Sequence, residues 1–144
     1  MSALFVLYAL SANKEEGHLT TVEGWEPQFS ISSGLLKERF GDMVCSCFGR
    51  TEETLPSVVA SMESIDFLFH DAGHSRKDYT RDFDVVIQKI APGAVVLFDD
   101  IRWEDPRFQD SPPETYRGWR EVVEHPRVKQ AVEIGENLGL ILIE

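Results

Sequence analysis

The sequence predicts one α/β domain with a doubly wound, mostly parallel sheet that ends in an antiparallel hairpin. Short apolar runs alternate with segments of helical apolar spacing along most of the chain. Residues 94–98 (AVVLF) are apolar throughout, which is typical of a strand covered on both faces. The composition, with 42% hydrophobic and 27% charged residues among 144, suits a single globular domain over residues 1–144, and no linker or repeat divides it.

The first half of the chain predicts two strand–helix pairs behind an apolar opening segment. β-Branched runs closed by glycine indicate the strands, and apolar residues three to four apart indicate the helices. In order, the expected elements are a helix or a strand at residues 4–10, a strand at 18–22, a helix at 29–40, a strand at 43–48 and a helix at 55–62.

The second half continues the alternation and then changes to a hairpin. A helix with apolar residues from Tyr79 to Ile90 is expected to stop at Pro92 and Gly93. The other expected elements are strands at residues 65–69 and 94–98, a helix at 116–125, and two closing strands, Val128–Ile134 and Leu138–Ile143, joined by the turn 135–137.

Charge and hydropathy exclude several classes of partner. A formal net charge of −11 repels polyphosphate, so nucleic acid is not expected as a partner, and a small molecule is the better default. The apolar runs are too short to cross a bilayer, and the first ten residues lack the basic start of a signal peptide. We therefore expect a cytoplasmic protein that makes no membrane contact.

The two cysteines of the chain lie close together in sequence. Cys45 and Cys47 alternate with Ser46 on an expected strand, and no second pair completes a zinc site. Free cysteine is among the most buried residue types, so both thiols are expected to be buried.

Three carboxylates follow two neighbouring apolar strands. Asp71 follows the strand at 65–69, and Asp99 and Asp100 follow the strand at 94–98. In an open parallel sheet this edge is where ligands bind. Clustered carboxylates suit a hard cation such as Mg²⁺, although aspartates at strand ends also cap helices or bind loop amides. Both interpretations stay open from the residues alone.

The order of four motifs resembles the class I S-adenosylmethionine-dependent methyltransferases, close to the small-molecule O-methyltransferase branch. The motifs are residues 20–24 (TTVEG), 48–50 (FGR), 66–74 (DFLFHDAGH) and 91–100 (APGAVVLFDD), and the closing hairpin matches the reversed final strand pair of that fold. The resemblance implies a Rossmann-like sheet and S-adenosylmethionine as the cofactor.

The resemblance also implies cofactor-binding residues. Glu23 ends the first expected strand, where an acid can accept both hydroxyls of a ribose. Around it, the positions implied to contact the cofactor are Gly24, Trp25, Gly49, Arg50, Thr51 and Asp71. Many relatives carry an acid for the adenine amine at the place of Arg50 and Thr51, and this chain carries none there.

On the acceptor side, the resemblance implies a catalytic role for Asp71 and His74 and a magnesium site at Asp71, Asp99 and Asp100. Such a metal would hold a substrate hydroxyl and lower its pKa. His74 occupies the position of the catalytic base, although a histidine that packs at the start of a helix fits equally well. Residues 102–113 are expected to form the wall around a small-molecule acceptor.

One part of the family pattern is absent. No G-x-G occurs before Glu23, so the family's first strand and its glycine-rich turn are missing, and the chain is expected to be truncated at its N-terminus. Residues 1–10 match the helix that normally follows that turn. A missing central strand leaves buried backbone groups unpaired, at a cost of about 1–3 kcal/mol each, and a homo-oligomer is one way to fill the gap.

The sequence therefore predicts methyl transfer from S-adenosylmethionine to a small acceptor, at oxygen. One alternative is a non-catalytic methyltransferase-like module or fragment that has lost cofactor binding together with the glycine turn. A weaker alternative is a metal-dependent hydrolase that uses the three acids directly. The sequence does not identify the acceptor.

Overall fold

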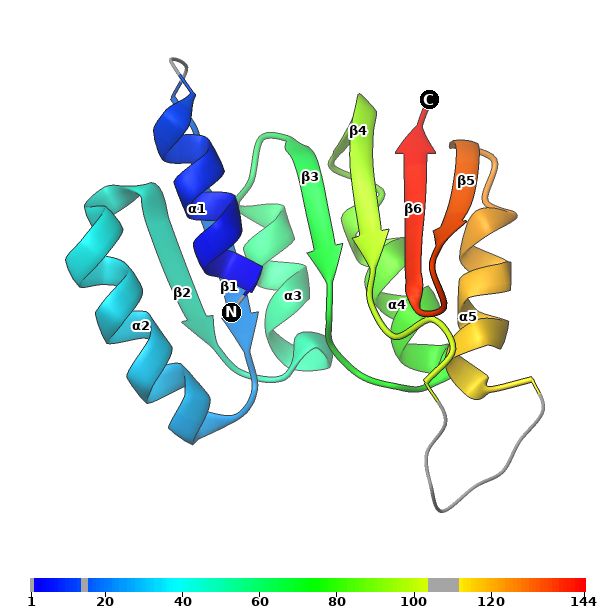
Figure 1. Ribbon diagram of the computed structural model, residues 1–144, viewed down its shortest axis with the longest axis horizontal. Helices are drawn as coiled ribbons and strands as arrows, with labels where there is room; N and C mark the ends of the chain where they lie inside the picture. The colour runs from blue at the N-terminus through cyan, green and yellow to red at the C-terminus, as the bar shows by residue number, and fades with distance from the viewer. Residues whose placement is uncertain (1, 14–15, 104–111) are drawn as a thin grey trace. The chain divides into compact units, whose positions relative to one another are not determined.

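The computed structural model describes residues 2–13, 16–103 and 112–144 (Figure 1). The chain divides into two compact units, Met1–Leu55 and Pro56–Glu144, and each is considered by itself. The elements in order are α1 (Ser2–Ala12), β1 (Leu19–Glu23), α2 (Glu26–Phe40), the 3₁₀ turn η1 (Gly41–Met43), β2 (Val44–Phe48), α3 (Thr51–Ala60), β3 (Ile65–His70), α4 (Arg76–Val86), β4 (Ile90–Phe98), α5 (Glu114–Val123), β5 (Val128–Ile134) and β6 (Leu138–Ile143). The division falls inside α3. The prediction of a single domain stays a prediction.

The first unit contains a two-stranded parallel sheet. β1 and β2 pair in register from Leu19 opposite Val44 to Glu23 opposite Phe48. The opening segment is a helix, α1, as its residues Ala and Leu favour. Leu7 of α1, Leu36 of α2 and Val44 of β2 form the buried cluster of this unit.

The cysteines of β2 are not buried as expected. Cys45 is exposed and Cys47 is half-buried. Successive side chains of a strand point to opposite faces, and Val44 points into the core cluster. Cys45 and Cys47 therefore take the positions on β2 whose side chains point away from that cluster, so the prediction of two buried thiols was wrong.

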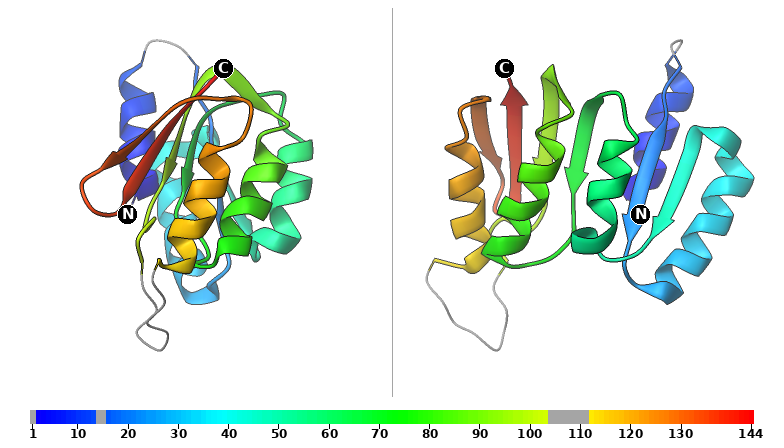
Figure 2. Two further views of the ribbon diagram at one scale, coloured as in Figure 1. Left: turned by 90° about the vertical axis from the view of Figure 1, so that its right-hand side faces the viewer. Right: turned by 180° about the vertical axis from the view of Figure 1, so that it is seen from behind.

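The second unit contains a four-stranded mixed sheet in the order β3-β4-β6-β5. β3 and β4 are parallel, β6 runs antiparallel to β4, and β5 and β6 form the predicted antiparallel hairpin. Helices α4 and α5 lie on the same face of this sheet, as the two opposite views show (Figures 1 and 2). The deeply buried core of the unit includes Tyr79, Phe83, Val86, Val96, Phe98, Ile101, Trp119, Val122, Ile141 and Ile143.

The two faces of β4 are buried to different extents. Val96 and Phe98 are fully buried, whereas Val95 and Leu97, which point to the opposite face, are only half-buried. Residues 94–98 form the expected strand, but only one of its faces is fully covered. The apolar residues 94–98 therefore lie in a strand with one face in the core and one face partly exposed to solvent.

The start of β4 also differs from the prediction. α4 ends at Val86, and Ile90 pairs with Ile65 of β3 instead of extending the helix. Pro92 and Gly93 lie inside the strand, where the register shifts between Ile65 and Phe67. A bulge of this kind accommodates a residue without an N–H and a glycine with φ +84°. The strand therefore begins before the two residues that were expected to stop the helix.

Within the described part of the chain, no helix has the length and apolar character needed to cross a membrane.

Candidate active site

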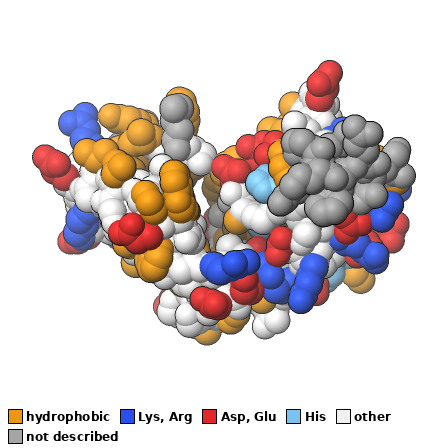
Figure 3. All heavy atoms as spheres, turned by 90° about the horizontal axis from the view of Figure 1, so that it is seen from below, with side chains coloured by type: hydrophobic (Ala, Val, Ile, Leu, Met, Phe, Trp, Pro, Cys, Tyr) orange, Lys and Arg blue, Asp and Glu red, His pale blue; other side chains and the backbone are white. Residues whose placement is uncertain are grey.

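The second unit brings the predicted acidic residues to one edge of its sheet. His70 ends β3 opposite Phe98 at the end of β4, and the Asp99 amide donates to the His70 carbonyl at 2.9 Å. Asp71 and Asp99 therefore follow adjacent strand ends, as parallel strands require. Viewed from the edge where β3 and β4 end, acidic side chains gather beside a histidine (Figure 3).

Asp71 lies in the electrostatic field of the other two acids. Partial burial, followed by the charges of Asp99 and Asp100, raises the pKa of the Asp71 carboxyl above its ordinary value. The nearby His74 and His70 act in the opposite direction but more weakly. The charges of Asp99 and Asp100 thus act on Asp71, and the predicted roles of the three carboxylates stay predictions.

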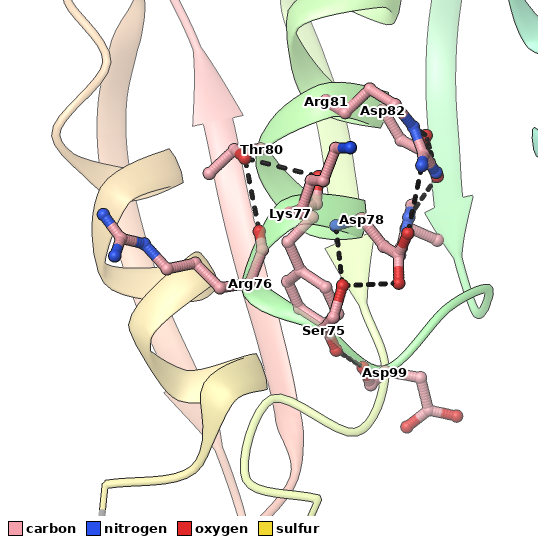
Figure 4. A network of polar contacts seen from close by, with 10 residues as sticks. Ser75, Arg76, Lys77, Asp78, Thr80, Arg81, Asp82 and Asp99 are labelled. Carbon is pink, nitrogen blue, oxygen red and sulfur yellow. Dashed lines mark hydrogen bonds and ion pairs between the residues drawn. The ribbon is translucent and has the colours of Figure 1, made fainter. Parts of the chain in front are cut away.

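Asp99 and Asp100 form a turn that is closed by a side-chain hydrogen bond. The Asp99 carboxylate accepts the Asp100 amide N–H at 3.0 Å, and Asp100 has φ +55°. Tyr79 of α4 donates its hydroxyl to the Asp99 carbonyl, while the Asp99 carboxylate points away from α4 (Figure 4). Burial, followed by the charges of Asp100 and Asp99, raises the pKa of Tyr79, so its hydroxyl remains protonated and keeps donating.

His74 contacts one of these acids directly. Its Nε2 lies 3.1 Å from Asp100 Oδ2, and 37% of the histidine side chain and 33% of the aspartate side chain are exposed. The His74 ring also lies against Trp103, with 4.5 Å between ring centroids. A carboxylate that accepts from one ring nitrogen fixes the tautomer and leaves the other nitrogen to accept a proton.

The N-terminus of α4, which directly follows His74, is stabilised by a helix cap. Ser75 is the N-cap residue: its Oγ accepts the Asp78 amide at 3.2 Å and donates to the Asp78 carboxylate at 2.7 Å (Figure 4). Arg81 bridges Asp78 and Asp82. The pattern Ser75-x-x-Asp78 has the spacing of a capping box, which is the sequence signal that the prediction did not use.

His70 is a core residue at the end of β3. It is buried, its Nε2 lies 3.1 Å from Asp82 Oδ2, and its ring packs on Tyr79 and Phe98. Its Nδ1 is buried without a hydrogen-bond partner among the described residues. The contacts with Tyr79 and Asp82 connect β3 to α4 and were not predicted.

The three carboxylates do not form a metal site in this arrangement. Among the residues that the structure describes, no three or more His, Cys, Asp or Glu side chains are grouped so that they could hold a metal ion. The Asp99 carboxylate binds the Asp100 amide, and the Asp100 carboxylate binds His74. The present side-chain positions therefore do not fit magnesium, and the predicted ligand set stays a prediction.

The first unit carries all the residues expected to bind the cofactor except Asp71, at the ends of β1 and β2. Glu23 ends β1, and its Oε1 accepts the Trp25 amide at 2.8 Å. A carboxylate has a second oxygen with which to accept ribose hydroxyls. Trp25 is 65% exposed. A Cβ on Gly24 would lie 3.4 Å from the Gly49 carbonyl oxygen, so Gly24 and Gly49 are close neighbours.

Gly49 is a position that only glycine fits. Its φ is +142°, and a Cβ there would lie 2.0 Å from Thr54 Oγ1. Its amide donates to the Glu23 carbonyl at 3.0 Å, which ties the ends of the two strands together. The Gly49 backbone therefore lies against the end of β1 beside Glu23, with the Thr54 side chain packed on it.

Arg50 and Thr51 begin the helix that follows. The Arg50 carbonyl accepts the first amides of α3, from Glu53 and Thr54, and Thr51 is the first residue of that helix. The Arg50 guanidinium lies 2.5 Å from the Glu52 carboxylate and is largely exposed. Their predicted roles at the adenine ring stay predictions.

The predicted acceptor wall is described only in part. Arg102 forms an ion pair with Glu133 of β5 and stacks over the Tyr116 ring at 4.2 Å, and Trp103 lies against His74. Residues 104–111 of the predicted wall lie outside the described residues.

Comparisons with solved structures show the fold. The structure resembles an O-methyltransferase from Bacillus cereus in complex with SAH, with a TM-score of 0.75 and 19% identity, over 96% of this chain and 68% of that one. It also resembles the O-methyltransferase TomG from Streptomyces achromogenes, involved in tomaymycin synthesis and solved with SAM, with a TM-score of 0.71 and 22% identity, over 96% of this chain and 67% of that one. The predicted Rossmann-like methyltransferase fold is thus confirmed, and the chain spans about two thirds of the length of these proteins.

Sequence comparisons address the family. None of the curated proteins compared with this chain matches it significantly. A family model described as a methyltransferase domain matches residues 1–101, which include β1 through β4 and the residues Glu23, Gly49, His74 and Asp100 discussed above. The predicted resemblance is therefore confirmed, and this chain belongs to the methyltransferase-domain family.

Proposed function

We propose that this protein transfers a methyl group from S-adenosylmethionine to an oxygen atom of a small-molecule acceptor. The family match supports methyl transfer. The observation that carries the assignment of the acceptor side is the contact between His74 and Asp100 at the carboxyl ends of β3 and β4. It provides a base, held in orientation, at the sheet edge where ligands bind.

Glu23, Gly24, Trp25 and Gly49 are assigned to the cofactor. The second Glu23 oxygen accepts hydroxyls of the ribose, and the backbone at Gly24 and Gly49 is assigned a place beside the nucleoside. Trp25 flanks the adenosine with its exposed ring. S-Adenosylmethionine would supply a methyl group on a positively charged sulfur for attack by the acceptor oxygen.

His74 is assigned the role of general base. With its Nε2–H donated to Asp100, its Nδ1 accepts the proton of the acceptor hydroxyl, and the Asp100 charge stabilises the imidazolium that forms. General-base catalysis of this kind contributes about 10²–10⁴-fold to a rate. Asp71, at the adjacent strand end, is assigned to the acceptor hydroxyl as a hydrogen-bonding partner.

Magnesium has no step in this mechanism, because the three carboxylates do not form a ligand group as arranged. They remain candidate ligands if their side chains turn toward a common point on acceptor binding. Turnover measured with EDTA and again with added Mg²⁺ distinguishes the two cases: equal rates support His74 alone, and a magnesium-dependent rate assigns the acids to a metal.

The cofactor assignment is tested by isothermal titration with S-adenosylhomocysteine. We expect binding to the wild-type chain and at least about tenfold weaker binding to Glu23→Gln, since a carboxylate forms hydrogen bonds worth about 1.5–3 kcal/mol. Glu38→Gln, on the exposed surface of α2, is the matched control and should bind like wild type. No heat at millimolar ligand would contradict cofactor binding by this chain.

The acceptor assignment is tested by methyl transfer to a panel of phenols and catechols. His74→Gln should lower kcat strongly while the affinity for S-adenosylhomocysteine stays unchanged. Cofactor binding without transfer to any acceptor would indicate a non-catalytic module. Phosphatase or esterase turnover that requires magnesium and ignores S-adenosylmethionine would instead favour the hydrolase alternative.

A further inference from the structure

Two thiols share one face of β2. Cys45 and Cys47 are two residues apart on this strand, so their side chains point to the same side, opposite to the buried Val44. Cys45 is exposed, Cys47 is half-buried, and neither is in a disulfide. The mechanism proposed above uses neither thiol.

The β1 residues that pair with the two cysteines are uncharged. β1 places Thr20 opposite Cys45 and Val22 opposite Cys47. On the other face, Thr21 and Ser46 are joined by a hydrogen bond of 3.3 Å. The thiols are thus presented by a paired strand, with no acid or base beside them in the adjoining strand positions.

The thiols are close enough to influence each other. Burial, followed by the charge of Cys45, raises the pKa of the Cys47 thiol, so the two side chains interact. The shift favours the protonated thiol, and a ligand must therefore displace that proton through its own affinity for sulfur.

Distance favours a bridging ion over a disulfide. Residues two apart on a strand have Cα atoms about 6.6 Å apart. This is near the upper limit of about 6.8 Å for a disulfide, whose sulfurs must approach to about 2 Å. An ion with metal–sulfur bonds of about 2.3 Å lets the sulfurs stand up to about 4.6 Å apart, so the strand keeps its ladder.

We propose that Cys45 and Cys47 together form a dithiolate site for a soft, two-coordinate cation of the copper(I) class. Soft thiolates select such ions. Structural zinc requires four ligands, and the described residues offer no group of three or more His, Cys, Asp or Glu side chains placed to hold a metal ion. On binding, two S–H bonds break, two protons go to solvent, two metal–sulfur bonds form, and the ion keeps its oxidation state.

The test is an anaerobic competition between the reduced protein and bicinchoninate for copper(I). We expect one copper per chain. Cys45→Ser and Cys47→Ser should each weaken binding by about 100-fold or more, because the second of two linked donors adds a factor of about 10²–10⁴. X-ray absorption should show two sulfur neighbours in wild type. This site is independent of the proposed methyl transfer.

Three controls make the result decisive. Ser46→Ala lies between the cysteines but on the other face, and should bind copper like wild type. Circular dichroism and melting temperature check that the serine variants fold, and Cys45→Ala and Cys47→Ala repeat the test with a different side chain. Tight binding retained by either single-cysteine variant, lost binding in Ser46→Ala, or one copper per two chains by sedimentation would each overturn the proposal.

Discussion

At the scale of single residues, the absence of a Cβ at Gly49 matters both for the backbone conformation and for the candidate cofactor site. Gly49→Ala would place a methyl group 2.0 Å from Thr54 Oγ1 at a φ of +142°. We expect a loss of about 1–3 kcal/mol in the free energy of unfolding. Urea denaturation measures it, and isothermal titration should show weaker binding of S-adenosylhomocysteine.

Gly34 provides the matched control for that substitution. It lies in α2 with an ordinary helical backbone, and a Cβ there would have no neighbour within 4 Å. Gly34→Ala should therefore stabilise the chain by about 0.5–1 kcal/mol. Equal destabilisation by both substitutions would show that the structure at Gly49 is not the cause.

Asp71 gives the site a predicted pH dependence. Burial and the charges of Asp99 and Asp100 raise its pKa in the folded state above the ordinary value of 3.8. The native state then holds more protons than the unfolded state between these two values, so this carboxyl makes the protein less stable as pH rises through that window. Above the folded-state pKa of Asp71, the full destabilisation by its charge is present. Below pH 3.8, the carboxyl is protonated in both states and the destabilisation is absent.

Asp71→Asn removes this effect. We expect the variant to melt at a higher temperature than wild type at pH 7, with a difference that shrinks as the pH falls toward 3.8. Differential scanning calorimetry in EDTA, which excludes stray cations, measures it. A difference that is constant with pH would mean that the Asp71 charge is not destabilising.

At the scale of elements, the cap of α4 sets the position of the edge that carries His74. Ser75→Ala removes the hydrogen bond to the Asp78 amide, and we expect a loss of about 1 kcal/mol. Ser30→Ala, on the exposed surface of α2, should change stability little. Chemical denaturation compares the two, and a smaller loss at Ser75 than at Ser30 would contradict the role of the cap.

The sequence predicted most elements because apolar spacing is a local signal. The prediction failed where pairing between strands distant in sequence determines the secondary structure. The helix predicted to include Ile90 gave way to a strand because Ile90 pairs with Ile65, twenty-five positions earlier. The opening segment stayed ambiguous because an all-apolar run has no period, and the exposure of Cys45 depends on which face of β2 meets the core.

At the scale of the whole molecule, net charge governs association. The chain carries −11 at pH 7 and has a pI near 4.7. The second sheet exposes several apolar residues, including Phe67, Val132 and Ile134, and we expect the net charge to oppose aggregation through them. Static light scattering should show aggregation growing as pH falls from 7 to 4.7, and a flat profile would contradict this account.

The candidate site was predicted in position more fully than in detail. The ends of β3 and β4 were expected to carry Asp71, Asp99 and Asp100 because parallel strands end at one edge. The contact between His74 and Asp100 and the hydrogen bond from Tyr79 to Asp99 depend on side-chain rotamers and on the packing of α4, which spacing does not encode.

The left-handed backbone of Asp100 affects how the site should be probed. Aspartate and asparagine adopt φ +55° with little difficulty, whereas alanine does not. Alanine scanning at this position would alter the path of the main chain and the partner of His74 together, and a lost activity would have two explanations. Asp100→Asn preserves the turn and removes the charge, so its kinetics report on the charge that faces His74 and Asp71 and not on the path of the main chain.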